Sequence, residues 1–460
     1  MKKNSWKKYT EENLNELNRI CEDYKKYLTV AKTEREATKE IIKRAKAKGY
    51  RDLEEYINNN IQIKTGDKIY VNNNGKAVAL FLIGEEDITK GMNILGAHID
   101  SPRLDLKANP LYEDKGFAYL DTHYYGGIKK YQWVTLPLAL HGVVCKKDGT
   151  TVDIVIGEDP SDPVVGITDL LPHLGQEQMK KTADKVVEGE NLDILIGSRP
   201  LKDEEDDDKV KDYILNLLKE KYNIEEDDFL SAEIEVVPAG AARDFGLDRS
   251  MVMSYGQDDS VCAYTSLEAF LQVSNVKRTA SCILVDKEEI GSVGSTGMAS
   301  HFYDNAITEI CALMGNTSPL AVRRVLKNSR MLSSDVNAAY DPLYKEVMEE
   351  KNATFFGKGV GFCKFTGSRG KSGSNDANAE YIAKIRKVLD DAKVDFQISE
   401  LGKVDIGGGG TIAYILANYN VDVIDCGVGV LSMHAPWEVT SKSDIYEAYK
   451  CYIAFLKNME

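Results

Sequence analysis

Short apolar runs that end at histidine or acidic residues constrain the fold of this chain more than any other feature. The clearest run, Met92–Ala97, opens into the motif GAHIDSP at 96–102. A short and nearly continuous apolar run is typical of a strand buried on both faces of a sheet. Two similar runs precede it, at 68–71 and 77–83. The pattern therefore predicts a buried strand that delivers His98 at its carboxyl end.

The same pattern returns toward the C-terminus. Strand-like runs end just before polar or glycine residues at 281–286, 330–334 and 421–426. Helical spacing of apolar residues marks the segments at 8–47, 261–273, 375–392 and 443–457. Alternating strands and helices predict an α/β domain, and ligands of such domains bind beyond the carboxyl ends of the strands. We therefore expect functional residues directly after these runs.

The middle of the chain has a different texture. Short alternating segments, typical of antiparallel strands, lie at 116–120, 138–144 and 152–156. One helix is predicted at about 208–221, after the acidic run 203–208, which is typical of a solvated loop. This change predicts a catalytic domain built from two separate segments, 1–103 and 243–460, with an inserted β-rich domain at 104–242 between them.

Composition narrows the function classes. The net charge of −15 disfavours nucleic-acid binding, because phosphate contacts need a basic patch. No apolar run approaches the length of a membrane span, and the charged N-terminal segment is not followed by an apolar signal region. The eight cysteines are scattered without a CxxC pair, which favours buried free thiols. We therefore expect a cytoplasmic protein whose partners are neither nucleic acid nor membrane.

His98 and Asp100 form an HxD motif after the predicted strand. In an extended stretch the two side chains lie on the same side, so the aspartate can orient the imidazole as a metal ligand and raise its basicity. Taken alone, the motif favours a surface turn, and only its position after the apolar run gives the metal-ligand interpretation equal weight.

Glu288 and Glu289 follow the run that ends at Asp286. Adjacent carboxylates repel each other at an apolar strand end unless a cation compensates them. One can bind the metal while the other takes a proton from the attacking water. The alternative for this pair alone is an exposed acidic turn.

Three further residues complete the candidate set. Asp258 could bridge two metal ions, or it could cap the next helix, a task that Asp259 could also perform. Asp335 ends an apolar run, and His434 lies in a turn between a glycine-rich segment and the last predicted helix. Each is compatible with a structural role, and the functional interpretation depends on the whole set. Two histidines with several carboxylates suit a pair of zinc ions in a hydrolase.

At this point the sequence resembles the M18 metallopeptidases, the aspartyl aminopeptidases. The segments that carry the resemblance are GAHIDSPRLDLKANP at 96–110, GQDDSVCAYTSLEAF at 256–270, DKEEIGSVGSTG at 286–297, SSDVNAAYDP at 333–342 and LSMHAPWEVTSKSD at 431–444. They span nearly the whole chain. The glycine run at 407–410 and the acidic run at 203–208 depart from the family pattern, and these departures bear on the preference for a substrate side chain more than on the chemistry.

The resemblance implies two zinc ions per subunit, with manganese or cobalt as alternatives. His98, Asp258 and Asp335 would hold one ion. Asp258, Glu289 and His434 would hold the other, so that Asp258 bridges the pair.

The resemblance also implies roles for the surrounding residues. Glu288 would be the general base, and Asp100 would orient His98. Lys364 corresponds to a lysine that faces an acidic substrate side chain. His173 corresponds to a histidine that the inserted domain offers to a neighbouring subunit.

The fold implied is a zinc-peptidase-like mixed α/β sheet flanked by helices, with an inserted β-rich domain that makes dimers within a homododecamer. The activity implied is the removal of single N-terminal residues, Asp or Glu above others, from peptides with a free N-terminus. Three alternatives stay open. They are the same mechanism with neutral or broad specificity, another two-metal amide hydrolase such as a deacylase or carboxypeptidase, and a catalytically silent shell or cargo-binding protein.

Overall fold

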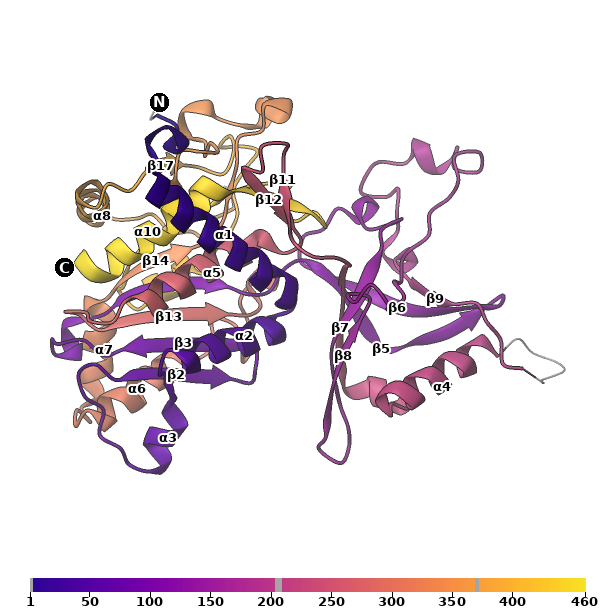
Figure 1. Cartoon of the computed structure of the whole chain (residues 1–460), viewed down its shortest axis with the longest axis horizontal. Coiled ribbons are helices and arrows are strands. Elements are labelled where there is room, and N and C mark those ends of the chain that lie inside the picture. The colour runs from indigo at the N-terminus through magenta and orange to yellow at the C-terminus, as the bar shows by residue number, and fades with distance from the viewer. Residues whose placement is uncertain (1–2, 203–208, 369–371) are drawn as a thin grey trace. The chain divides into compact units, whose positions relative to one another are not determined.

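The structure is a computed structural model that describes residues 3–202, 209–368 and 372–460. Its contacts divide the chain into two compact units (Figure 1). Unit 1 comprises Met1–Asp100, Ala242–Met433 and Glu438–Glu460, and unit 2 comprises Ser101–Ala241 and His434–Trp437. The acidic run at 203–208, predicted to be a solvated loop, lies outside the described residues.

Among the described residues of unit 1, nine strands form a mixed sheet. In spatial order they are β1 (Arg51–Asp52), β2 (Lys68–Asn73), β3 (Ala77–Leu82), β13 (Ala280–Val285), β4 (Asn93–His98), β14 (Arg330–Ser334), β18 (Asp422–Gly427), β16 (Val360–Cys363) and β17 (Phe396–Ser399). The four central strands β13, β4, β14 and β18 are parallel to one another. Their carboxyl ends therefore meet at one edge of the sheet.

Helices cover both faces of this sheet (Figure 1). Because side chains alternate along a strand, Leu95 and Ala97 of β4 enter one core while Ile94 enters the other. The first core is shared with α1 (Glu11–Val30), α2 (Glu34–Ala47), α5 (Gln257–Gln272), α8 (Ala379–Asp391) and α10 (Lys442–Asn458). The second is shared with α3 (Leu53–Asn58), α6 (Phe302–Leu313), α7 (Pro319–Asn328) and α9 (Ala413–Ala417). Burial on both faces explains why the central strands are nearly continuous apolar runs.

A smaller sheet of unit 1 was not anticipated from the sequence. Its five strands, all among the described residues, are β11 (Arg243–Phe245), β12 (Met251–Ser254), β20 (Glu438–Ser441), β19 (Gly429–Leu431) and β15 (Asn337–Ala338). Strands of two to four residues are too short to show an alternating pattern in sequence. This sheet matters because Asp258 follows β12 and Asp335 precedes β15.

Unit 2 is an antiparallel sheet with one long helix. In the described ranges its six strands run in the order β8 (Thr151–Ile156), β7 (Leu138–Cys145), β10 (Ala232–Pro238), β5 (Arg103–Asp114), β6 (Phe117–Tyr125) and β9 (Ile194–Gly197). The helix α4 spans Val210–Tyr222 and packs against β5, β6 and β9. The antiparallel strands and the single helix agree with the texture predicted for the middle of the chain.

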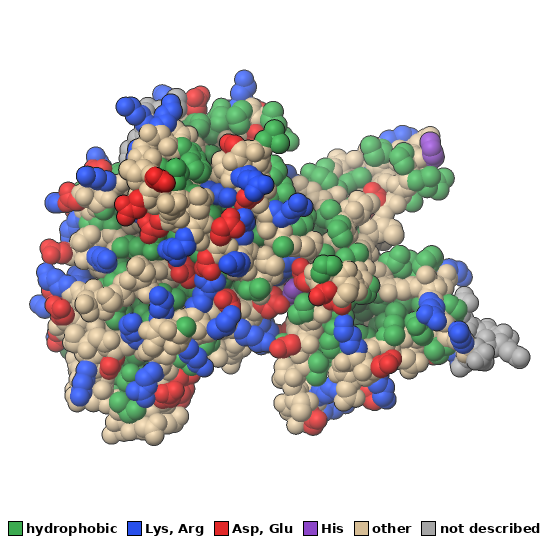
Figure 2. Space-filling view, in the orientation of Figure 1, with side chains coloured by type: hydrophobic (Ala, Val, Ile, Leu, Met, Phe, Trp, Pro, Cys, Tyr) green, Lys and Arg blue, Asp and Glu red, His purple; other side chains and the backbone are tan. Residues whose placement is uncertain are grey.

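Two surface properties follow from the structure. On the face of unit 1 seen in Figure 2, Lys and Arg side chains alternate with Asp and Glu, so this face carries mixed charge. No helix in the described ranges has both the length and the apolar character required to cross a membrane.

All eight cysteines are free thiols, and six of them are buried. Cys145 is exposed and Cys363 is half-buried, so the prediction of buried thiols was wrong at these two positions.

Candidate metal centre

The carboxyl edge of the parallel strands collects the candidate metal ligands of unit 1 and the candidate base Glu288. β4 ends at His98, and β14 ends one residue before Asp335. The 3-10 helix η7 (Glu288–Ile290) begins shortly after β13. Since these three strands are parallel neighbours, their ends bring together residues that are far apart in the sequence. The loop from β12 to α5 adds Asp258, whose backbone is non-helical (φ −83°, ψ 105°).

The imidazole of His98 has oxygen atoms close to both of its nitrogen atoms. Its Nδ1 atom lies 2.9 Å from the backbone carbonyl oxygen of Asp100. Because a carbonyl oxygen only accepts, Nδ1 carries the proton in this arrangement. The Nε2 atom then faces the carboxylates, 3.2 Å from Asp258 Oδ1 and 3.9 Å from Glu288 Oε2. In the neutral ring with its proton on Nδ1, Nε2 is the nitrogen that can bind a metal ion, and it points toward carboxylate oxygens that could bind the same ion.

Two overlapping groups in unit 1 have ligand atoms close enough to share an ion. The ligand atoms of His98, Asp258 and Asp335 all lie within 4.8 Å of one another. The same limit holds for His98, Glu288 and Glu289. Zinc binds imidazole nitrogen and carboxylate oxygen at about 2.0–2.2 Å, so each group could close around a cation with small side-chain movements.

The Asp100 carboxylate has a second role that the sequence did not indicate. Its Oδ1 atom lies 3.4 Å from His98 Nδ1, longer than the bond made by its own carbonyl oxygen. Its two oxygens accept the backbone N–H groups of Glu288 and Glu289, each at 3.1 Å. Asp100 therefore orients the imidazole mainly through its backbone and fixes the Glu288–Glu289 backbone through its side chain.

The charges of the cluster around His98 favour the binding of a cation. Burial raises the pKa of Asp335 well above its usual value, and the neighbouring charge of Asp259 raises it further. Burial disfavours a charged His98, but its hydrogen bonds with Asp100 and Asp258 outweigh this effect and raise its pKa. Several buried carboxylates facing one imidazole are costly to ionise together unless positive charge is supplied. The donor set, nitrogen and oxygen without sulfur, fits zinc.

Sequence reasoning did not assign a functional role to two positioning residues. Asp259, which is fully buried, accepts the backbone N–H of His98 at 3.3 Å. Glu438 accepts the backbone N–H of Asp258 at 3.0 Å. The doubled aspartate in GQDDS was the available signal for Asp259. Nothing local marks Glu438, which lies 180 residues from its partner.

His434 lies in unit 2, in the segment His434–Trp437 that connects β19 and β20. Its Nδ1 atom lies 2.9 Å from the carbonyl oxygen of Gly127. His173 is exposed in the unit 2 loop between β8 and β9.

Lys364 directly follows β16, and its ammonium nitrogen lies 3.6 Å from Asp376 Oδ1. It also lies 4.3 Å from the ring centroid of Phe365. In the glycine run at 407–410, the carbonyl oxygen of Gly409 accepts the backbone N–H of Gly367.

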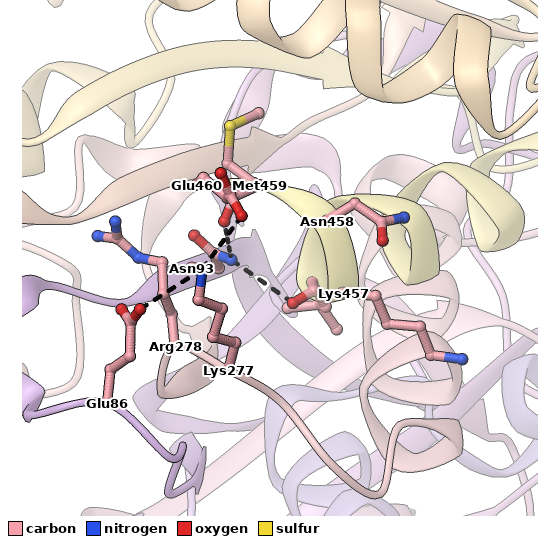
Figure 3. Close-up of a pocket in the computed structure, with 9 residues that line it drawn as sticks. Glu86, Asn93, Lys277, Arg278, Lys457, Asn458, Met459 and Glu460 are labelled. Atoms are coloured by element: carbon pink, nitrogen blue, oxygen red, sulfur yellow. Dashed lines mark hydrogen bonds and ion pairs between the residues drawn. The ribbon is translucent and has the colours of Figure 1, made fainter.

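A pocket of about 280 Å³ lies at the opposite, amino edge of the sheet (Figure 3). Asn93, at the start of β4, donates to the carbonyl oxygen of Met459 at 2.9 Å. Lys277 pairs with Glu86 at 3.7 Å and with Glu460 at 3.1 Å. The lining groups thus pair with one another and fasten the end of α10 to the sheet.

An α/β sheet that gathers an imidazole and buried carboxylates beyond its parallel strands defines the class of metal-dependent hydrolases. The family model described as Aminopeptidase I zinc metalloprotease (M18) matches residues 27–456. This match covers most of the chain, and the chain belongs to the M18 family of zinc aminopeptidases. The resemblance and the α/β fold predicted from the sequence are both confirmed, and the chain is an aminopeptidase that acts on peptides.

Relatives and solved structures support this assignment over the whole length. The chain is 59% identical over 456 residues to a probable M18 family aminopeptidase 1 of Clostridium acetobutylicum, covering 99% of this chain and 98% of the relative. The crystal structure of aminopeptidase I from that organism superposes with a TM-score of 0.91 at 56% identity, covering 99% of both chains.

More distant structures share the architecture as well. The crystal structure of an M18 aminopeptidase from Thermotoga maritima has a TM-score of 0.94 at 44% identity and covers 99% of both chains. The S. cerevesiae mApe1 dodecamer, at 18% identity, shares the fold with a TM-score of 0.78 and covers 97% of this chain and 98% of that one.

Proposed function

We propose that this aminopeptidase uses two zinc ions to remove single N-terminal residues, Asp and Glu above others, from peptides with a free N-terminus. The observation that carries the proposal is the buried cluster around His98 Nε2, in which Asp258 Oδ1 lies at 3.2 Å. Mn²⁺ or Co²⁺ would suit the same nitrogen and oxygen donors.

The proposed ligands divide into two sets that share one carboxylate. His98, Asp258 and Asp335 would hold the first ion, in agreement with their closely spaced ligand atoms. Asp258 would also bind the second ion, together with Glu289 and His434, as the family resemblance implies. When bound, zinc would polarise the scissile carbonyl and lower the pKa of the attacking water.

Glu288 is the proposed general base. Its side chain is 16% exposed, so a substrate can reach a carboxylate that is otherwise held in place. The Asp100 carboxylate fixes the backbone of this residue through the Glu288 N–H at 3.1 Å. Glu288 would take a proton from the water as the new C–O bond forms, and would return one to the leaving amine as the C–N bond breaks.

Lys364 and His173 are the proposed sources of acidic specificity. The Lys364 side chain is 42% exposed, and Asp376, 3.6 Å away, is a carboxylate that an acidic substrate side chain could replace. Because the chain carries a net charge of −15, attraction of acidic peptides must come from such local positive groups.

Assembly and location complete the proposal. The inserted domain at 104–242 would make dimers within a homododecamer in the cytoplasm, and His173 would act in the site of a neighbouring subunit. Exposed apolar side chains of its loop, Val164, Leu170, Leu171, Leu174 and Met179, support a role in contact between subunits.

The test is an assay of the metal-loaded protein on N-terminal Asp, Glu, Leu, Lys and Ala substrates, with a chelated control. We expect chelator-sensitive cleavage that is fastest for Asp and Glu. Lys364→Met should raise KM for the acidic substrates alone, and Lys384→Met on α8 is the matched control. Preference for apolar or basic residues would discard the acidic pocket. Absence of cleavage of any free-amine substrate would overturn the proposed function.

A further inference from the structure

We propose that the backbone carbonyl of Gly127 fixes the tautomer and the ring direction of His434. This inference rests on the proposed function, in which His434 binds the second zinc ion. It assigns to Gly127 the role of a positioning residue for a proposed metal ligand.

The hydrogen bond determines which nitrogen can bind metal. His434 Nδ1 lies 2.9 Å from the carbonyl oxygen of Gly127. A carbonyl oxygen has no proton to donate, so Nδ1 must be the donor. In a neutral imidazole the lone pair then belongs to Nε2, which is the atom left to coordinate zinc.

Gly127 lies so close to the His434 ring that a side chain at this position would press against the imidazole. A Cβ atom at Gly127 would lie 3.3 Å from His434 Nδ1 and 3.7 Å from its Cε1 atom. The first distance is tighter than ordinary van der Waals contact, so the ring would have to move by a few tenths of an ångström. Glycine therefore allows the backbone to meet the imidazole edge directly.

The backbone of His434 is held in an uncommon conformation. Its φ is 63°, in the left-handed region that a non-glycine residue rarely adopts. Such a conformation costs free energy and persists where surrounding contacts impose it, often at functional sites. Within unit 2, Trp437 at the other end of the same segment lies close to Gly240, whose added Cβ would be 3.7 Å from the indole. The segment is thus supported at both ends.

His98 in unit 1 makes a hydrogen bond of the same kind. His98 Nδ1 lies 2.9 Å from the carbonyl oxygen of Asp100, which leaves Nε2 facing the carboxylates. Histidines that bind metal usually donate their other N–H to a carbonyl or carboxylate, and loss of that partner typically costs 10- to 100-fold in metal affinity. Each of the two candidate histidines therefore has a backbone carbonyl oxygen as the partner of Nδ1.

The test is a zinc titration of the metal-free protein against a chelating indicator. Gly127→Ala should weaken one of two zinc affinities by about 10- to 100-fold, with the other unchanged. Gly189→Ala is the matched control, because its Cβ would lie 3.4 Å from Tyr124, a side chain outside the proposed zinc site. The control should leave both affinities and kcat unchanged. Equal affinities in Gly127→Ala and the wild type would overturn the inference.

His434→Ala separates this inference from the proposed function. If that variant keeps both zinc affinities, the ligand assignment fails with the proposed function. If it loses one while folded Gly127→Ala loses none, only the role of Gly127 fails. Should Gly127→Ala not fold, ¹⁵N-histidine labelling of the zinc-loaded wild type decides, with His434→Gln to assign the signal. Zinc on Nε2 with a proton on Nδ1 supports the inference, and zinc on Nδ1 overturns it.

Discussion

The two ends of strand β4 carry polar groups that are compensated in opposite ways. At the amino end, Asn93 lies beside ion pairs that join Lys277 to Glu86 and Glu460. At the carboxyl end, His98 faces one buried carboxylate and three half-buried ones. The first end is closed by groups of opposite charge and fastens α10 to the sheet. The second end has an excess of negative charge, which a bound cation would balance.

The difference lies in how the charges are balanced. Where charged side chains pair with one another they hold the fold together, and where carboxylates stay in excess they form a candidate metal site. Charged side chains alone would mark both ends as interesting. At the carboxyl end, burial and the neighbouring charge of Asp259 raise the pKa of Asp335. Changes at the two ends should therefore affect different properties.

The largest expected effect is on turnover at the carboxyl end. Glu288→Gln keeps the size of the side chain but removes the proton acceptor, and should lower kcat by about 10²- to 10⁴-fold. Zinc content should stay at the wild-type level, as measured by metal analysis of the purified protein. Glu86→Gln at the amino end is the control and should retain full kcat. Near-normal turnover of Glu288→Gln would rule out its role as the base.

The next effect concerns the support of the base. Asp100→Asn replaces one acceptor oxygen with an N–H donor, which opposes the backbone N–H of Glu288 or Glu289. We expect a 10- to 100-fold loss in zinc affinity or kcat, typical of changes to groups that orient ligands. Both are measured by titration and steady-state kinetics. Asp87→Asn, a matched change in the loop that precedes β4, should change neither.

Asp444 in α10 is a buried carboxylate whose charge is stabilised by backbone N–H groups and not by a cation. Asp444 accepts the backbone N–H groups of Gly357 and Gly359, both at 2.8 Å, yet burial raises its pKa to about 7. An unfolded Asp releases its proton near pH 4, so between about pH 4 and 7 the native state binds more protons. Stability from this group is therefore lost as pH rises, by about 1.4 kcal/mol per pH unit.

Asp444→Asn removes that titration. The free energy of unfolding of the variant, measured by denaturant titration of metal-free protein, should fall less steeply over this pH window than that of the wild type. The variant should gain relative to the wild type as the pH approaches 7. Parallel pH profiles for the two proteins would contradict the raised pKa.

The smallest effect is expected at the amino end. Lys277→Met removes ion pairs whose lysine side chain is 58% exposed. Exposed ion pairs contribute about 0.2–1 kcal/mol, so the melting temperature should fall slightly and kcat should not change. A large loss of activity in this variant would show that the two ends of the sheet are coupled.

Much of the catalytic sheet could be predicted because its strands are apolar on both faces. The runs at 68–71, 77–83 and 281–286 all correspond to strands. The helix predicted at 375–392 begins later, at Ala379, because the backbone of the preceding Asn378 is extended (φ −64°, ψ 135°). The helices α6 and α7 were not among the predicted segments.

The sequence by itself determined which residues could carry the chemistry. Hydrophobic patterning is local, so it marks strand ends, and the motifs around His98, Glu288 and Asp335 lie directly after such ends. Family membership followed from the same motifs, because they occur together and in one order along the chain.

Only the tertiary structure decided how these residues are held. The partnership of Glu438 with Asp258 joins residues 180 positions apart. The turn of the Asp100 carboxylate toward the Glu288 backbone depends on two parallel strands that end side by side. Neither leaves a mark in the sequence, because hydrogen bonds between distant segments depend on the geometry of the sheet and not on any local period.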